Sequence, residues 1–380
     1  MKSLKILLTS VLIVFAGLMS AHKTTPEWLK NAVFYDIYPC SFMDSDGNGV
    51  GDLPGITSKL DYVKSLGVDA IWMTPIFESG WFDGGYDIKD YYKIDPRFGQ
   101  KSDFVNLINE AHKRGLKVCL DLVPGHSSDQ HQWFKKAATE GSEGRYADYY
   151  IFADSISEKD LAEIKQRNQT EDPQASRIGN WVLTEDAKPG EPLEGKFKGK
   201  YYFKNHFACQ PALNFGYANP DPSKPWQQSV DAPGPKALRR ELKNIMAYWF
   251  DLGVDGFRVD MAASLVKNDI DKKETGRLWN DMREWVDREY PGKVLISEWG
   301  KPSLSCPAGF DCDFLIVSKN PGMQQLVLGS QNVKIVGKDA YFEKTGIGGI
   351  DKFVDEFSNY YNASKDYGYI SLFSASHDVN

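Results

Sequence analysis

Residues 253–261 read Gly-Val-Asp-Gly-Phe-Arg-Val-Asp-Met, and this stretch decides the fold. Before it, apolar side chains recur at helical spacing from Leu238 to Leu252, and Gly253 stands where a helix commonly ends. The residues 256–261 that follow are mostly apolar, as expected of a short strand that is buried on both faces. The stretch therefore predicts a helix, a glycine cap and a buried parallel strand in direct succession.

The same junction occurs twice earlier in the chain. Gly67 leads into the strand-like run 70–75, and Gly115 leads into 117–123. Four further apolar runs complete a set of seven expected strands in alternation with helices: 33–38, 294–297, 314–317 and 369–374. Such units fit an open parallel sheet or a closed barrel. Seven strands with one long insertion favour an α/β fold of the (β/α)8 TIM barrel type, with strands one to seven present and the eighth missing from the 380 residues.

The spacing of these glycines predicts where the insertion lies. The first two are 48 residues apart and the second and third are 138 apart, so a long segment follows the third strand. This segment is rich in turn formers and aromatic residues, without a helix–strand rhythm, and we interpret it as a small subdomain. The expected organisation is a first barrel part at 22–126, an inserted subdomain at 127–235 and a second barrel part at 236–380.

The N-terminus predicts export. Lys2 and Lys5 precede an apolar run from Ile6 to Met19, and small residues follow up to Ala21. This pattern is typical of a secretory signal peptide at 1–21, with a retained N-terminal anchor as the alternative. No later run approaches the length of a membrane span, so we expect no membrane association after signal removal and a periplasmic or extracellular location.

Charge and cysteine content narrow the function classes. The net charge is −7, from 45 basic and 52 acidic residues, which disfavours a nucleic-acid partner. The five cysteines are an odd number, and only Cys306 and Cys312 are close enough in sequence to suggest a local disulfide, a pairing that the sequence leaves open. His131 and His206 are expected in surface or loop positions, and the oligomeric state cannot be inferred.

Three carboxylates follow expected strands. Asp260 ends the run 256–261, Glu298 follows 294–297, and Asp378 comes after 369–374. Most acidic residues cap helices or lie in solvated loops, so any one of these alone would mean little. Because the carboxyl ends of barrel strands converge on one face, three together indicate an active site.

Arg258 adds an electrostatic expectation. It stands two residues before Asp260 on the same strand, so both side chains project to one face. A fixed cation there should lower the pKa of Asp260, as a nucleophile requires, whereas a desolvated Glu298 beside other carboxylates should have a raised pKa and keep its proton. For an acetal substrate this pair would form the retaining arrangement of nucleophile and acid/base.

Four motifs now become recognisable in order: Asp121-Leu-Val-Pro-Gly-His126, Gly256-Phe-Arg-Val-Asp260, Ile296-Ser-Glu-Trp299 and His377-Asp378. With them the sequence resembles the α-amylase superfamily, glycoside hydrolase family 13, over nearly all of the expected mature chain. The resemblance implies that Asp260 is the nucleophile, Glu298 the acid/base and Asp378 the carboxylate that grips sugar hydroxyls. It also implies that His126, Arg258 and His377 surround the bound sugar.

Further matches refine this expectation. Gly85-Tyr-Asp-Ile-Lys-Asp-Tyr91 looks like the family segment in which Tyr86 stacks on the first sugar and Asp87 closes the pocket with hydrogen bonds. Gln210-Pro-Ala-Leu-Asn214 resembles a motif of oligo-1,6-glucosidases and neopullulanase-like members. Both imply a preference for small oligosaccharides over long chains. Trp299, directly after Glu298, is the best placed tryptophan for a sugar-stacking wall, with packing in the core as the alternative.

An acidic loop follows the first expected strand. It carries side-chain oxygens at Asp44, Asp46, Asn48 and Asp52, a carbonyl at Val50, and glycine at its sixth position. This matches the front of a Ca²⁺ loop, but the twelfth position is Gly55 and not Glu, so the loop is not an EF-hand. A similar loop binds metal in oligo-1,6-glucosidase-like members, and the resemblance implies one structural Ca²⁺. A solvated acidic turn is the alternative.

The departures from the family bear on completeness. Pro124-Gly-His126 stands where most relatives have Val-Asn-His, so no second calcium is predicted. An eighth strand and a C-terminal β domain are not found in the sequence as given, and we expect it to be C-terminally truncated.

The expected function is a retaining glycoside hydrolase that cleaves α-glucosidic bonds of starch-derived oligosaccharides, with an α-glucan or malto-oligosaccharide as substrate. A transglycosylase, or a trehalose-synthase-like isomerase acting on maltose-type sugars, is the alternative. A noncatalytic sugar-binding relative is remote, because such proteins normally lose one or more carboxylates. The sequence leaves open α-1,4 or α-1,6 linkage, exo or endo action, and the ratio of hydrolysis to transfer.

Overall fold

The computed structural model describes residues 25–170, 172–195, 197–317, 319–329, 339–344, 349–373 and 376–378. The predicted signal segment 1–21 lies outside these residues. Within them, no helix is long and apolar enough to cross a membrane.

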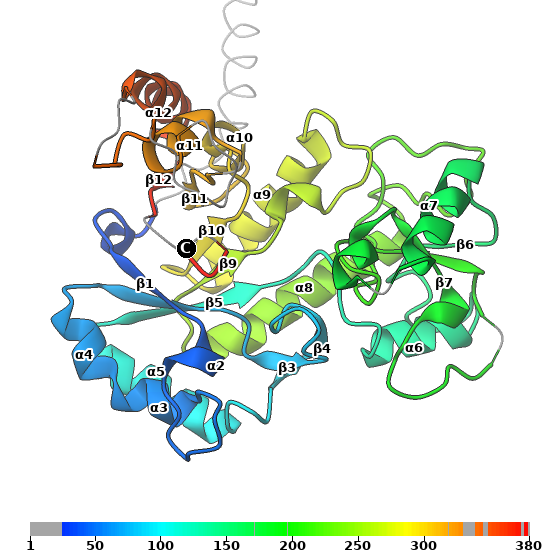
Figure 1. Ribbon diagram of the computed structural model, residues 1–380, viewed down its shortest axis with the longest axis horizontal. Helices are drawn as coiled ribbons and strands as arrows, with labels where there is room; N and C mark the ends of the chain where they lie inside the picture. The colour runs from blue at the N-terminus through cyan, green and yellow to red at the C-terminus, as the bar shows by residue number, and fades with distance from the viewer. Residues whose placement is uncertain are drawn as a thin grey trace, which may run out of the picture.

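A seven-stranded sheet organises the barrel part of the chain, in the order β1-β2-β5-β9-β10-β11-β12 (Figure 1). Every neighbouring pair is parallel. The strands are β1 (Phe34–Ile37), β2 (Ala70–Met73), β5 (Lys117–Leu122), β9 (Gly256–Val259), β10 (Val294–Ser297), β11 (Cys312–Phe314) and β12 (Tyr369–Ser371). Spatial order follows chain order, and the sheet curls. This confirms the (β/α)8 barrel type with strands one to seven.

One strand differs in position from its prediction. The sixth strand, expected at 314–317, forms at Cys312–Phe314 as β11. Cys312 pairs with Ile296 of β10, which sets this register. Leu315 and Val317, which made the later run look strand-like, pack instead in a small cluster under the following helix. The run was apolar because it is buried, and burial alone does not distinguish strand from loop.

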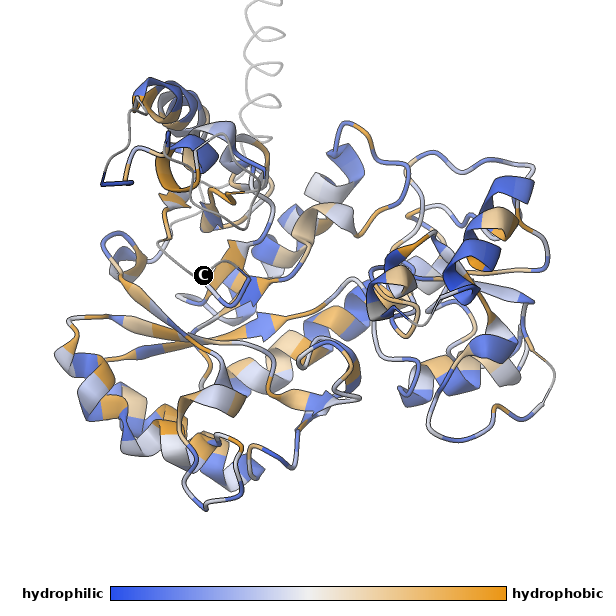
Figure 2. Cartoon of the chain, in the orientation of Figure 1, coloured by the Kyte–Doolittle hydropathy of each residue, from blue (hydrophilic) through white to orange (hydrophobic). Residues whose placement is uncertain are grey.

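Helices alternate with these strands. They are α3 (Leu53–Ser58), α4 (Leu60–Ser65), α5 (Lys101–Lys113), α8 (Pro233–Asp251), α9 (Lys273–Glu289), α10 (Pro302–Ser305), α11 (Pro321–Val327) and α12 (Asp351–Ser364). The three predicted caps, Gly67, Gly115 and Gly253, have φ of +80°, +68° and +103°. In this left-handed region a side chain would be strained, which explains glycine at each junction. In Figure 2 the sheet strands are largely orange, whereas the helices carry both orange and blue stretches.

The long helix α8 illustrates how the core is built. Its apolar side chains, at the predicted helical spacing, are buried against the sheet: Leu238, Leu242, Ile245, Met246, Trp249 and Phe250. Burying one such side chain contributes about 1.5–3 kcal/mol. Trp249 is 1% exposed and donates its indole N–H to the carbonyl of Tyr91, 2.9 Å away. The polar end of this large ring is therefore satisfied inside the core.

The segment between β5 and α8 has its own small sheet. Strands β6 (Phe152–Ala153), β8 (Tyr201–Phe203) and β7 (Trp181–Leu183) lie antiparallel in that order. They accompany α6 (Gln132–Thr139), α7 (Glu158–Asn168), η2 (Pro173–Arg177) and η3 (Thr184–Asp186). A separate apolar cluster, which includes Ile151, Ile164 and Trp181, fills this part. In Figure 1 it forms the green lobe.

The remaining short elements precede α5 or follow β9. They are η1 (Glu27–Leu29), α2 (Pro39–Phe42), the antiparallel pair β3 (Phe77–Ser79) and β4 (Ile88–Ile94), and η4 (Ala262–Ser264).

Of the surface or loop positions predicted for His131, the structure shows a loop position, and the side chain is buried. It is 4% exposed and caps α6, where its Nδ1 accepts the Trp133 N–H at 3.0 Å. Burial lowers the pKa of His131 to about 3 from 6.5, with a small opposing effect of Asp90. The ring is therefore neutral, which the acceptor role of Nδ1 requires.

This cap predicts a pH-dependent stability. Between pH 6.5 and about 3 the unfolded chain binds a proton at His131 and the folded chain does not, so the free energy of unfolding decreases as pH falls through that window. His131→Asn keeps an oxygen for the cap without a titrating ring. We expect the variant to lose less stability between pH 7 and pH 5 in urea unfolding than the parent. Equal losses would contradict the assignment.

Candidate active site

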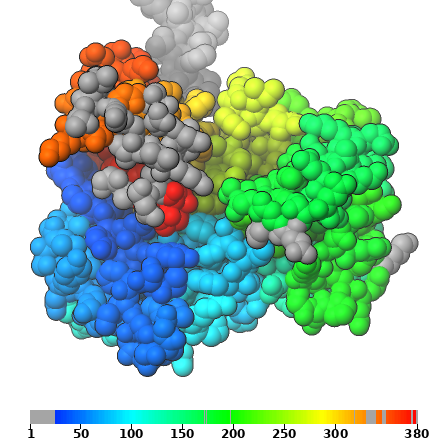
Figure 3. Space-filling view, viewed as in Figure 1, coloured from blue at the N-terminus to red at the C-terminus, as the bar shows by residue number. Residues whose placement is uncertain are grey.

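A cavity of about 320 Å³ runs along the inside of the sheet between its edge strands β1 and β12. Residues from six of the seven strands or their ends line it, and they include Asp36, Trp72, Arg258, Glu298 and Asp378. Figure 3 shows the C-terminal residues, in red, at the surface between the N-terminal part, in blue, and the inserted segment, in green. The fold thus brings two of the three predicted catalytic carboxylates and the predicted arginine to one cavity.

Arg258 lies at the centre of this group. Its Nη1 is 2.8 Å from Asp121 Oδ1 and 3.0 Å from Asp260 Oδ1, and its Nη2 is 3.1 Å from Glu298 Oε2. The guanidinium side chain is 3% exposed and also lies over the ring of Trp72. Register explains the arrangement, because Arg258 on β9 pairs directly with Asp121 on β5. The sequence analysis assigned no role to Asp121. Its position inside an otherwise apolar strand could have indicated that it is a buried partner of a cation.

The proton distribution is the reverse of the one the sequence predicts. Burial and the charge of Glu298 raise the pKa of Asp260 well above its ordinary value, although Arg258 opposes them. Burial also raises the pKa of Glu298, but Arg258 and the Met261 N–H outweigh it, and the net direction is down. The prediction assigned Arg258 to Asp260 alone. In the structure the cation is shared by three carboxylates, and Glu298 has an additional donor.

That donor comes from a strained residue. Met261, directly after Asp260, has φ of 45° and ψ of 38°, and its N–H donates to Glu298 Oε2 at 2.8 Å. A left-handed conformation costs a side-chain-bearing residue about 1–2 kcal/mol. The turn points the main chain after the strand toward Glu298. Asn205 of the inserted segment contacts the Met261 sulfur at 3.6 Å.

Tyr86 joins this group through Asp121. Its hydroxyl donates to Asp121 Oδ2 at 2.9 Å and lies 2.8 Å from His377 Nε2. The rings of Tyr86 and His377 are stacked, with centroids 5.7 Å apart. The predicted sugar-stacking residue therefore lies beside the carboxylate cluster, and one of its neighbours is a predicted sugar-binding histidine.

Asp36 positions His377 from the opposite edge of the sheet. Its Oδ2 accepts the His377 N–H at 3.1 Å and lies 3.3 Å from His377 Nδ1. Burial alone would lower the pKa of His377, but Asp36 and Asp378 raise it overall. The Asp378 side chain is 62% exposed, and its Oδ2 lies 3.5 Å from His377 Nε2. The sequence analysis did not identify Asp36 as a site residue. Its signal was the same as that of Asp121, an acidic residue inside an expected strand.

Asp87 and Trp299 are both buried. Asp87 is 1% exposed; its Oδ1 accepts from Ser79 and from the N–H groups of Phe82 and Asp83, whereas its buried Oδ2 has no hydrogen-bond partner. Trp299 is 4% exposed, and its ring packs against Phe310. Neither side chain presents a free face to the cavity. Both residues lie outside the strands, Asp87 directly before β4 and Trp299 two residues after β10.

Asp83, in the same loop, is only partly buried, whereas Asp87 is fully buried. The Asp83 Oδ2 accepts a hydrogen bond from the Gln210 side-chain amide at 2.7 Å. Burial and the charges of Asp87 and Asp378 raise the pKa of Asp83 to about 6 against the effect of Gln210. Gln210 of the 210–214 motif therefore positions Asp83. The feature of the sequence that could have indicated Asp83 as a site residue is its position three residues before Tyr86.

Two further histidines lie near the site, His126 directly before the inserted segment and His206 within it. His126 is 2% exposed, donates from Nε2 to the Tyr86 carbonyl and accepts the Asn205 amide at Nδ1. Burial lowers the pKa of His126 to about 3, so it is neutral. His206 lies in a loop, one of its two predicted positions, and is half-buried. Its Nε2 accepts a hydrogen bond from Arg177. Burial lowers the pKa of His206, and the charges of Asp378 and Glu298 oppose this shift.

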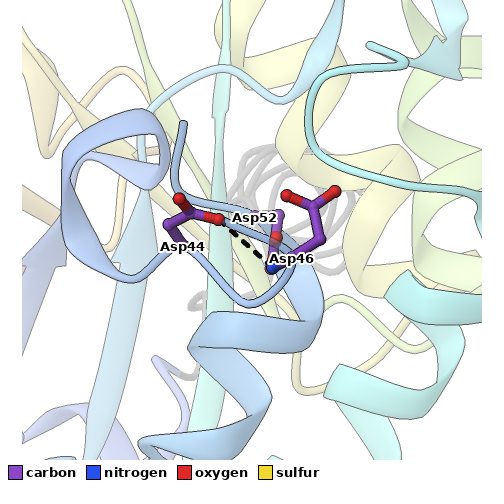
Figure 4. A group of neighbouring side chains, drawn as sticks. All are labelled: Asp44, Asp46 and Asp52. Atoms are coloured by element: carbon purple, nitrogen blue, oxygen red, sulfur yellow. Dashed lines mark hydrogen bonds between the residues drawn. The ribbon is translucent and has the colours of Figure 1, made fainter. Parts of the chain in front are cut away.

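The acidic loop brings three of its predicted metal ligands together. One carboxylate oxygen each of Asp44, Asp46 and Asp52 lies within 4.8 Å of the others (Figure 4). Asp44 accepts main-chain N–H groups of Gly47 and Gly49, and Asn48 Oδ1 accepts that of Val50. Oxygens bound to one Ca²⁺ at about 2.3–2.6 Å lie up to about 5 Å apart. The carboxylate donors therefore fit a hard cation.

The structure contains no disulfide between Cys306 and Cys312. The Cys306 thiol lies 3.7 Å from the carbonyl of Tyr369, and that of Cys312 lies 3.9 Å from the carbonyl of Asp313.

Comparison with known proteins now places this geometry in a family. Residues 36–306 match the model of the α-amylase catalytic domain. The chain belongs to the α-amylase family, glycoside hydrolase family 13. The motif-based resemblance is thereby confirmed.

Relatives within the family carry several activities in their names. The chain is 37% identical to the trehalose synthase/amylase TreS of Mycolicibacterium smegmatis over 72% of its own length and 41% of that protein. It is 38% identical to an oligo-1,6-glucosidase of a Bacillus species over 75% of its length and 48% of that protein. The structure of Bacillus licheniformis trehalose-6-phosphate hydrolase matches with a TM-score of 0.66 and 30% identity, over 93% of this chain and 59% of that chain. The chain thus spans less than half the length of these curated relatives.

The shared arginine predicts a large stability effect. Arg258→Gln leaves Asp121, Asp260 and Glu298 without their common cation, and such a loss typically costs about 3–5 kcal/mol. The pKa values of these carboxyl groups should then rise, so the folded state takes up protons and the loss should be smaller at pH 5 than at pH 8. Urea unfolding at the two pH values measures both effects. A pH-independent loss would contradict the shared-cation arrangement.

Proposed function

We propose that the protein is a retaining glycoside hydrolase that cleaves α-glucosidic bonds of starch-derived oligosaccharides. The observation that carries this proposal is the group of Asp260, Glu298 and Arg258 beside one cavity in an α-amylase-family barrel. Asp260 attacks the anomeric carbon as Glu298 donates a proton to the departing glycosidic oxygen. Water, deprotonated by Glu298, then releases the sugar from Asp260.

This chemistry requires the proton to move within the carboxyl pair. Without sugar, the pKa directions favour a proton on Asp260 and a charge on Glu298. Both side chains contact the Arg258 guanidinium, so they lie close to each other and a proton can be exchanged between them. A sugar that enters between them would separate Glu298 from its donors and favour its protonated form. The pair then titrates as one unit, with one proton retained.

Residues around the pair suit a sugar ring. We propose that Tyr86 stacks on it, and that His377 and Asp378 hydrogen-bond its hydroxyls, with His126 fixing Tyr86 through the main chain. We assign pocket closure to Asp83 in place of Asp87, because Asp83 is the partly exposed member of the loop and Gln210 holds it in place.

Transfer of the glucosyl group to a sugar is the second candidate. The similarity to a protein named trehalose synthase/amylase favours it, and the same covalent intermediate serves both outcomes. Analysis of the products formed from maltose, with and without added glucose, separates the two. Glucose alone supports hydrolysis, and a nonreducing disaccharide supports isomerisation.

We further propose one structural Ca²⁺ in the acidic loop, held by Asp44, Asp46, Asp52, the Asn48 amide oxygen and the Val50 carbonyl. The hard oxygen donors support this choice. Export to the periplasm or the cell exterior remains our proposal on the N-terminal sequence alone.

The catalytic assignment predicts a severe loss of activity. Asp260→Asn or Glu298→Gln should reduce kcat/KM on nitrophenyl α-glucoside or maltotriose about 10⁴-fold, because each removes a group that acts in the bond-breaking step. NMR of the first product should give the α anomer. Asp87→Asn serves as the control, since we expect it to affect stability more than kcat. A β anomer as first product would refute the retaining mechanism.

The calcium proposal predicts ligand-dependent stability. Ca²⁺ at about 100 times its Kd should stabilise the fold by about 2.7 kcal/mol, and EDTA should reverse the gain. Asp44→Asn should abolish the response, whereas Glu143→Gln, which removes a charge from an exposed loop, should retain it. Thermal melts with Ca²⁺ or EDTA measure this. An unchanged melting temperature in the parent would exclude the site.

A further inference from the structure

A second hollow, of about 610 Å³, lies in the inserted segment. Its floor is aromatic and consists of Trp181, Phe203, Tyr217 and Trp226. The residues that line it differ entirely from those of the barrel cavity. The proposed catalytic mechanism therefore does not use it.

The aromatic floor is ordered by ring contacts. Trp181 is 6% exposed and meets Phe203 and Trp226 edge to face, with centroid distances of 5.2 and 5.8 Å. Phe203 and Trp226 remain half-buried, so part of each ring borders the hollow. Buried Trp181 thus acts as a support for the two more accessible rings.

Trp226 also borders a neighbouring hollow. This one has a volume of about 240 Å³ and is lined by Asp148, Asn214 and Gln228, among others. Trp226 therefore borders both hollows. A half-buried aromatic ring in this position can serve as a stacking platform for an extended ligand.

The rim of the larger hollow is polar and mostly uncharged. Ser155, Asn180 and Asn268 are exposed there and offer hydroxyl and amide groups. Lys224 pairs with Asp221 at 3.2 Å, and Lys267 Nζ donates to the carbonyl of Ser264 at 3.0 Å. Both cations thus have partners. An aromatic floor with such a rim matches a ligand that has flat apolar faces and many hydroxyls, rather than an anion or a lipid.

The hollow adjoins the segment that follows Asp260. Lys267 N–H donates to the carbonyl of Gly216, and Ala218 N–H donates to that of Lys267, so the loop pairs with the hollow's wall. Ser264, which accepts from Lys267, donates to the carbonyl of Met261. A ligand in the hollow would therefore be held by the same lobe that reaches the active site.

From these observations we propose that the hollow around Trp226 is a second binding site for an α-glucan chain, distinct from the catalytic cavity. The choice of ligand class rests on the proposed function. The site holds longer substrates on the inserted segment, and short ones do not need it.

Calorimetry with maltoheptaose on the protein carrying Asp260→Asn tests the proposal. We expect two binding sites, one of which disappears when Trp226→Ala is added; loss of such an aromatic anchor weakens binding about 10-fold or more. Trp285→Ala, at a half-buried tryptophan on α9, is the matched control and should keep both sites. Ser155→Trp, at an exposed rim position, should block the hollow without disturbing the aromatic floor and guards against misfolding of the alanine variant.

Turnover measurements distinguish the two proposals. With Asp260 intact, Trp226→Ala should leave kcat/KM for nitrophenyl α-glucoside unchanged and raise KM for soluble starch. If the parent does not hydrolyse the glucoside, the proposed function fails. If it does, but binds maltoheptaose at one site or binds it equally after both Trp226→Ala and Ser155→Trp, the second site is overturned.

Discussion

One guanidinium holds the centre of this protein together. Arg258 is buried and shared by Asp121, Asp260 and Glu298, so one positive charge faces three potential negative ones. Burying the full excess of negative charge would be costly, and the group lowers this cost by retaining a proton. The need to keep one proton among these carboxyl groups links the stability of the barrel centre to acid/base chemistry, since both depend on the same side chains.

The sheet register makes this sharing possible. Arg258 lies opposite Asp121 on β5 and opposite Ile296 on β10, two residues before Glu298. Three adjacent strands thus deliver their polar side chains to one point. The inserted segment adds Asn205, which contacts both His126 and Met261, and Gln210, which holds Asp83. The lobe is therefore part of the wall around the site and also carries the hollow around Trp226.

Much of the fold could be predicted from local pattern. The glycine caps at 67, 115 and 253 and the apolar strands after them are dictated by backbone sterics and burial, which act over a few residues. The order of the motifs identified the family. Arg258, Glu298 and Asp378, which these motifs contain, line one cavity as expected. The sixth strand was displaced, because its position depends on pairing with β10 and not on its own apolar run.

The sequence by itself determined the helix–strand units, the place of the insertion and the identity of the acidic residues at the strand ends. Only the tertiary structure decided which oxygen Arg258 contacts, that Met261 donates to Glu298, and that Asp83 rather than Asp87 is the partly exposed member of its loop. The physical reason is the distance along the chain over which each interaction acts. Caps and periodicity depend on neighbours along the chain, whereas proton affinity depends on charges and donors that distant strands bring within about 3 Å, in a medium that screens them weakly.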